Sequence, residues 1–186
     1  MDLIHSLGAY TLQVVEWLFI FLPLLFHGII GMIIVARGKR NVTIYTFREN
    51  IRYTLQRWTG VIAFAFILWH VFQTRGWINC SWWLDHVTRP AGGGIFDAKD
   101  AARTSAEAVQ VAAWVAVLYA VGVLSAVYHF ANGLWTMGIT WGVWTGPRAQ
   151  AWATIFCAGI GLILAGFGIA TIYGFSVYPL SHSSPG

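Results

Sequence analysis

The chain has 186 residues, of which 58% are hydrophobic, 16% aromatic and only 10% charged, whereas about 25% of the residues of an ordinary soluble domain are charged. This composition excludes intrinsic disorder and argues against a soluble fold. Eleven Lys and Arg against seven Asp and Glu give a formal charge of +4, and the basic residues are too scattered for a nucleic-acid-binding face. We therefore expect the lipid bilayer, and no nucleic acid, as a partner. Cys80 and Cys157 form no disulfide framework, zinc motif or covalent haem-attachment motif.

Four apolar segments are long enough to cross a membrane. They are residues 10–36, 55–74, 109–137 and 151–173. About 20 apolar residues in a helix cross a hydrocarbon core of about 30 Å, and helices are required because an isolated strand would leave its backbone groups unsatisfied in lipid. Pro23 lies inside the first segment and predicts a local kink. The sequence therefore predicts an all-α membrane protein, a transmembrane helical bundle of one domain with a long loop at 75–107.

The charges between these segments predict their orientation. Residues 37–57 contain six basic residues and one acid, so the positive-inside rule places them in the cytoplasm. Residues 75–107 contain four basic and four acidic residues, so we expect this loop outside. Both chain ends then lie outside. An external N-terminus this close to the first span predicts a preceding helix, either missing from this sequence or supplied by another chain.

Three histidines lie inside the predicted spans, His27, His70 and His129, one on each of the first three. An ionisable side chain in a membrane is costly and marks a functional site by default. At about 1.5 Å per residue, His27 and His129 lie at similar depths towards the cytoplasm, and His70 lies nearer the external face. Imidazole ligates haem iron, and bundles bind haem between facing helices. Plain helix-to-helix hydrogen bonds are the alternative.

Other intramembrane residues refine this interpretation. A proton relay in a transporter would usually bring carboxylates into the membrane, and only Glu16 is a candidate. Glycines lie near each histidine, among them Gly60 before His70. They would allow a flat macrocycle to approach a helix backbone, although small residues equally serve helix packing.

Three strings around the histidines carry a resemblance to a known family. They are FLPLLFHGIIG around His27, LQRWTGVIAFAFILWHVFQTRGW around His70 and VYHFANGLWTMGITWGVWTGPRAQ around His129. They resemble the cytochrome b subunit of succinate:quinone oxidoreductase, which includes succinate dehydrogenase and fumarate reductase, in the type whose single polypeptide carries two haems b. That family has five membrane spans with axial histidines on the first four. The present sequence matches it from the second family helix onward, over about residues 16–173 apart from the external loop.

The resemblance implies a ligand set for haem b. His27 and His129 would ligate the haem nearer the cytoplasm. His70 would ligate an outer haem, whose second ligand lies on the family helix that this sequence lacks and would come from outside this chain.

Further site residues follow from the chemistry of haem and quinone. Haem propionates need cationic or hydroxyl partners in a low dielectric, although the same side chains can be interfacial anchors. The candidates are Gln56, Arg57 and Thr59 on the cytoplasmic side and Arg75 on the outer side. Quinone reduction takes up two protons, so its site needs a proton-linked group, and Glu16 is our candidate.

The resemblance also implies a function. The chain would anchor a flavoprotein subunit and an iron–sulphur subunit in the cytoplasmic membrane of a prokaryote, with residues 37–57 contacting the iron–sulphur subunit. It would pass electrons from that subunit through haem b to quinone and make no bond to succinate itself. The alternatives are a cytochrome b anchor of another respiratory dehydrogenase, or a haem-free scaffold or transporter.

Overall fold

The computed structural model describes residue 11 and residues 14–38, 47–78 and 80–180, and this part of the chain is helical without a strand. Four of its helices are long and apolar enough to cross a membrane, which confirms the predicted all-α fold class. They run over Val14–Arg37, Asn50–Arg75, Ala113–Thr140 and Pro147–Ser176. The chain divides into two compact units, Met1–Arg57 and Trp58–Gly186.

The first unit contains a helix that widens next to its proline. A π-helical turn, η1 (Trp17–Phe21), leads directly into α2 (Leu22–Arg37). Proline has no N–H group to donate to the carbonyl four residues earlier. The N–H of Leu22, just before Pro23, donates to the carbonyl of Trp17, five residues back. The irregularity at Pro23 is therefore one widened turn.

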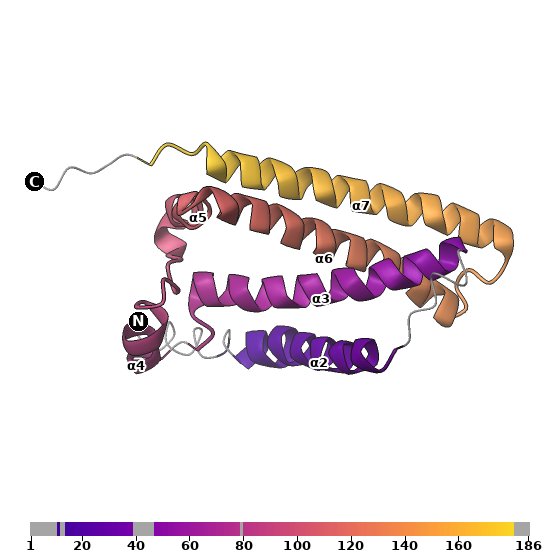
Figure 1. Cartoon of the computed structure of the whole chain (residues 1–186), viewed down its shortest axis with the longest axis horizontal. Coiled ribbons are helices and arrows are strands. Elements are labelled where there is room, and N and C mark those ends of the chain that lie inside the picture. Colours follow the sequence, from indigo (N-terminus) through magenta and orange to yellow (C-terminus); the bar gives the residue numbers. More distant parts are fainter. Residues whose placement is uncertain (1–10, 12–13, 39–46, 79, 181–186) are drawn as a thin grey trace, which may run out of the picture. The chain divides into compact units, whose positions relative to one another are not determined.

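The second unit is organised around α6 (Ala113–Thr140) and α7 (Pro147–Ser176), which run side by side in opposite directions (Figure 1). The helix α3 (Arg48–Arg75) begins in the first unit, and its part from Trp58 onward belongs to the second. A small core of Val109, Val115 and Tyr119 is buried among apolar neighbours. These neighbours come from α3, α6 and α7 and include Phe66, Trp69, Ile172 and Phe175.

The predicted external loop contains short helices of its own. They are α4 (Ser81–Trp83), η2 (Leu84–Thr88), η3 (Ala98–Asp100) and α5 (Ala101–Gln110). Residues 94–96, which we call the strap, return to the end of α3. Their N–H groups donate to the carbonyls of Phe72, Gln73 and Thr74 at 3.2, 3.1 and 3.1 Å. The last carbonyls of a helix have no partner within it, so the strap satisfies the end of α3.

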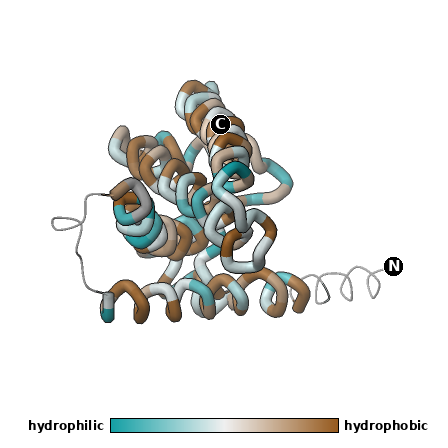
Figure 2. The backbone as a smooth tube through the Cα atoms, turned by 90° about the vertical axis from the view of Figure 1, so that its right-hand side faces the viewer, coloured by the Kyte–Doolittle hydropathy of each residue, from teal (hydrophilic) through white to brown (hydrophobic). Residues whose placement is uncertain are grey.

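Residues of high hydropathy recur along the long helices (Figure 2). On α7, Trp152, Leu162 and Phe167 are 72%, 75% and 70% exposed. Such a surface is unfavourable in water and suited to the hydrocarbon of a bilayer. The helices and their apolar exterior are those of a multi-pass membrane protein.

Candidate functional site

The imidazole of His129 on α6 lies against α3 at Gly60. A Cβ atom placed on Gly60 would lie 2.8 Å from Cε1 and 2.9 Å from Nδ1 of His129, which is closer than real Cβ contacts. Only a glycine therefore leaves room for the ring in this position. The sequence placed Gly60 near the His70 site. In the fold, the missing side chain of Gly60 leaves the space that the His129 ring occupies, which we call the seat of His129.

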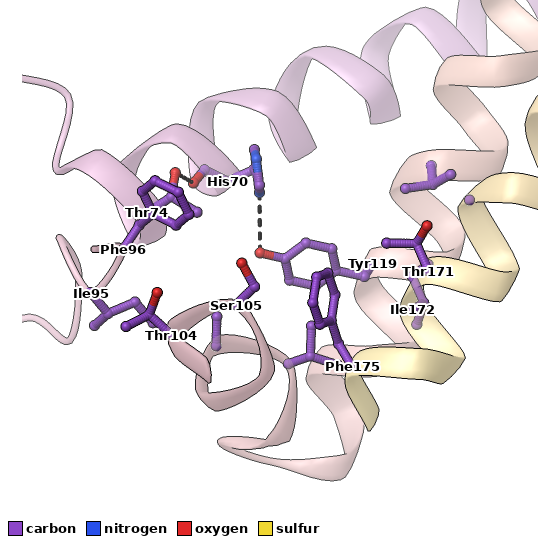
Figure 3. A pocket seen from close by; sticks show the side chains of 14 residues that line it. His70, Thr74, Ile95, Phe96, Thr104, Ser105, Tyr119, Thr171, Ile172 and Phe175 are labelled. Carbon is purple, nitrogen blue, oxygen red and sulfur yellow. Dashed lines mark hydrogen bonds between the residues drawn. The ribbon is translucent and has the colours of Figure 1, made fainter. Parts of the chain in front are cut away.

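His70 is held by a hydrogen bond to the next helix. Its Nδ1 lies 3.1 Å from the hydroxyl oxygen of Tyr119 on α6 (Figure 3). The ring of Phe66, one turn earlier on α3, stacks on the His70 ring with a centroid distance of 5.8 Å and an interplanar angle of 22°. Both contacts fix the orientation of the imidazole.

Tyr119 was missed at the sequence level, and so was its second partner, Gln73. The hydroxyl of Tyr119 donates to Oε1 of Gln73 at 2.8 Å, and Gln73 is only 5% exposed. A signal was present in the sequence. Gln73 is a polar residue in an apolar span, three positions after His70, and residues three apart share one face of a helix.

His70 and His129, the histidines of the predicted spans in the second unit, lie at two levels. Gly60, the seat of His129, and His70 are ten residues apart on α3, which corresponds to about 15 Å along a helix axis. The sequence predicted His129 towards the basic 37–57 segment and His70 towards the loop at 75–107, and their depths in a membrane stay a prediction.

A cavity of about 270 Å³ adjoins His70 and Tyr119 (Figure 3). His70 and Tyr119 form part of its wall. Further hydroxyl groups and apolar residues from the strap, α5, α6 and α7 complete it. The hydroxyls are those of Thr74, Thr104, Ser105 and Thr171, and the apolar residues include Ile95, Phe96, Ile172 and Phe175. The cavity brings the loop at 75–107 and the ends of three long helices to the same imidazole.

His27 and Glu16 belong to the first unit. His27 lies on α2, and Glu16 lies in the helical stretch directly before η1. Since His129 belongs to the second unit, the pairing of His27 with His129 stays a prediction.

Arg57 has structural partners within the first unit. Its Nη2 donates to the carbonyls of Ile34 and Val35 at 3.0 and 2.6 Å. These carbonyls lie at the C-terminal end of α2, where unpaired acceptors and the helix dipole favour a cation. The guanidinium also lies 5.2 Å from the ring centroid of Tyr53. Arg57 thus ties α3 to the end of α2.

The other expected propionate partners occupy two places on α3. Gln56 and Thr59 precede Gly60 by four residues and by one residue, and Arg75 is the exposed last residue of the helix. Their role towards a propionate stays a prediction, as it does for Arg57. Lys39 and Arg40 of the basic segment lie outside the described residues.

The histidines fit the requirements of haem ligation. An imidazole that ligates haem in a helical bundle has to be held in one orientation between facing helices. The glycine seat of His129 and the hydrogen bond of His70 both provide such fixation. Within residues 14–38, 47–78 and 80–180, no three or more His, Cys, Asp or Glu side chains gather as a metal site, and a pair of axial imidazoles needs no such group.

Comparison with known proteins identifies one informative relative. The chain is 32% identical over 166 residues to the succinate dehydrogenase cytochrome b558 subunit of Bacillus subtilis (strain 168). The alignment covers 86% of this chain and 71% of that protein. No family model matches the chain, and no solved structure matches it.

Proposed function

The chain belongs to the cytochrome b subunits of succinate dehydrogenase, and we propose that it carries electrons from an iron–sulphur subunit, by way of haem b, to a membrane quinone. The relationship over 86% of the chain is the observation that carries this proposal. The chain is the membrane anchor of such a complex. It does no chemistry on succinate, which is the work of a flavoprotein subunit.

His27 and His129 are the proposed axial ligands of an inner haem, nearer the cytoplasm. Haem b, when bound, supplies reversible one-electron chemistry at its iron. If His27 and His129 both held the haem iron, no position would remain for oxygen or another substrate, and the site would be restricted to electron transfer. The close approach of Gly60 on α3 to the His129 ring on α6 supports this role, because it restricts the ring to one position.

His70 is the proposed ligand of an outer haem, with its second ligand supplied from outside this sequence. The propionates of the two haems would find Gln56, Arg57 and Thr59 at the inner level and Arg75 at the outer level. Cations and hydroxyl groups stabilise carboxylates in a low dielectric.

The partners follow from the family. We propose that the flavoprotein and iron–sulphur subunits bind on the cytoplasmic side of a prokaryotic cytoplasmic membrane. The basic segment 37–57 would face the iron–sulphur subunit. Its positive charge would attract an acidic docking surface and speed association.

The decisive experiment is haem stoichiometry on the purified complex, with His129→Ala beside the wild type. We expect a bis-histidine spectrum in the wild type and loss of the inner haem in the variant. A variant that retains the full haem content would refute His129 as a ligand. Co-purified flavin and iron–sulphur subunits would separate this proposal from a cytochrome b anchor of another dehydrogenase. A colourless wild type would leave a scaffold or transporter.

Glu16 is the proposed proton-linked group of the quinone site. The substitution Glu16→Gln removes the titratable carboxyl group at nearly constant size. We expect it to lower quinone turnover with the haem spectrum intact, measured with a soluble quinone analogue on the same preparation. Unchanged turnover would remove Glu16 from the quinone site.

A further inference from the structure

Three side chains and one backbone carbonyl form a chain of hydrogen bonds next to His70. Nε2 of Gln73 donates to the carbonyl of Ala108 at 3.1 Å. The hydroxyl of Tyr119 donates to Oε1 of Gln73 at 2.8 Å. Nδ1 of His70 lies 3.1 Å from the same hydroxyl oxygen. These hydrogen bonds thus link α3, α6 and the end of α5.

The backbone carbonyl fixes the direction of every bond in this chain. The carbonyl of Ala108 can only accept, so it selects the amide nitrogen of Gln73, and the amide oxygen of Gln73 must face Tyr119. That oxygen also only accepts, so it takes the single hydroxyl proton of Tyr119. The hydroxyl oxygen then has only lone pairs for His70, and Nδ1 of His70 must carry the proton.

The surroundings protect this arrangement from water. Gln73 and Tyr119 are 5% and 9% exposed. The rings of Phe66 and Trp69 meet the Tyr119 ring edge-on at centroid distances of 5.3 and 5.4 Å. Hydrogen bonds are stronger in such a low-dielectric environment, and an unpaired member would be costly. Each member therefore holds the next in one orientation.

We propose that Gln73 and Tyr119 are positioning residues that hold His70 in the Nδ1–H tautomer and so present the lone pair of Nε2 to the iron of an outer haem. The inference rests on the proposed function, because it requires that His70 ligates haem. Ligating histidines commonly donate their second N–H group to an oxygen, which fixes the ring and makes the ligating nitrogen more basic. Here the acceptor is a tyrosine hydroxyl on the neighbouring helix, itself aligned by a glutamine.

This arrangement has a consequence for the reduction potential. A more basic imidazole stabilises the ferric state over the ferrous state, which lowers the midpoint potential. Removal of the Tyr119 hydroxyl is therefore expected to raise the midpoint potential of the outer haem. The inner haem, at the level of Gly60, is expected to keep its potential and serves as an internal reference.

The test uses the whole purified complex with Tyr119→Phe, which removes the hydroxyl and keeps the ring. Tyr173→Phe is the matched control, because Tyr173 lies on α7 and is 68% exposed. Potentiometric titration and the low-spin ferric electron paramagnetic resonance signals report each haem separately. We expect an upward shift of the outer midpoint and a moved outer signal in Tyr119→Phe only. Loss of such a partner typically weakens metal affinity by about 10- to 100-fold, so partial loss of the outer haem would also support the proposal.

Gln73→Leu tests the donor-to-acceptor direction of these hydrogen bonds. Leucine leaves the Tyr119 hydroxyl without its acceptor, so the hydroxyl is free to turn and His70 loses its defined tautomer. The potential should shift in the same direction as in Tyr119→Phe. The double variant should shift little further than either single variant, because the two residues act as one unit.

Two outcomes would overturn the inference. In the first, Tyr119→Phe lowers the melting temperature but leaves the outer potential and resonance signal as in Tyr173→Phe, which makes Tyr119 a structural tie between helices. In the second, the wild-type complex contains only the inner haem. The second result would leave the inner haem and the electron-transfer function intact, whereas a complex without any haem would refute the proposed function itself.

Discussion

Gly60 illustrates how one residue can control a ligand on another helix. The side chain that it lacks would occupy the position of the His129 ring. The glycine weakens α3 slightly, since glycine lowers helix stability by up to about 1 kcal/mol relative to alanine. Because glycine has no side chain, α3 and the His129 ring can lie in close contact without either being displaced.

Gly60→Ala is expected to displace the His129 imidazole. The added methyl group overfills a packed site, which typically costs about 1–3 kcal/mol, and the moved ring should ligate the inner haem poorly. We expect reduced inner-haem content and a lower melting temperature of the purified complex. Gly166→Ala on α7 is the control, because its Cβ would meet open space. Equal haem content in the two variants would contradict the seat role of Gly60.

At the scale of elements, hydrogen bonds from side chains and from the strap secure the C-terminal ends of α3 and α7. The strap closes the end of α3. Gln110, at the end of α5, donates through Nε2 to the carbonyls of Phe175 and Tyr178 at 2.7 and 2.9 Å. Carbonyls at a helix C-terminus have no partner within the helix, so Gln110 supplies one for α7. The strap and α5 therefore hold the ends of two helices near His70.

Gln110→Leu should loosen the end of α7. Leucine has a similar size but donates no hydrogen bond, and each lost bond removes about 0.5–1.5 kcal/mol of net stability. We expect faster hydrogen exchange of the backbone amides at 173–178 and a modest fall in melting temperature. Gln150→Leu at the opposite end of α7 should leave this exchange unchanged, because the Gln150 side chain donates to the nearby carbonyl of Thr145 at 3.4 Å, far from residues 173–178. Protection equal to wild type in Gln110→Leu would show that Gln110 does not hold the end of α7.

At the scale of the whole molecule, the chain combines an apolar exterior with polar groups on the inner faces of its helices. On α7 the side chains of Trp152, Leu162 and Phe167 are exposed, whereas Tyr119 on α6 and Gln73 on α3 are buried. A membrane protein needs this distribution, because lipid offers no hydrogen-bond partner for a polar group. The hydroxyls of Thr74, Thr104 and Ser105 follow the same logic, since they line the cavity beside His70 and none of these residues is exposed.

Local sequence features determined the number and type of the long elements. Hydropathy over about 20 residues decides whether a segment can enter lipid, and lipid then requires a helix. The four long helices therefore follow from the hydropathy of local segments alone. The three histidines could also be singled out in advance, because an ionisable residue in an apolar span is conspicuous whatever its neighbours are.

The tertiary structure alone decided which residues meet. The sequence associated Gly60 with His70 and left Tyr119 unnoticed, whereas the fold pairs Gly60 with His129 and Tyr119 with His70. Such pairs depend on the rotation and offset of α6 against α3, and hydropathy carries no information on either, because lipid-facing and helix-facing positions are both apolar. The composition determined that the chain enters a membrane as helices. Only the packing of α3 against α6 decided how each imidazole of that pair is held.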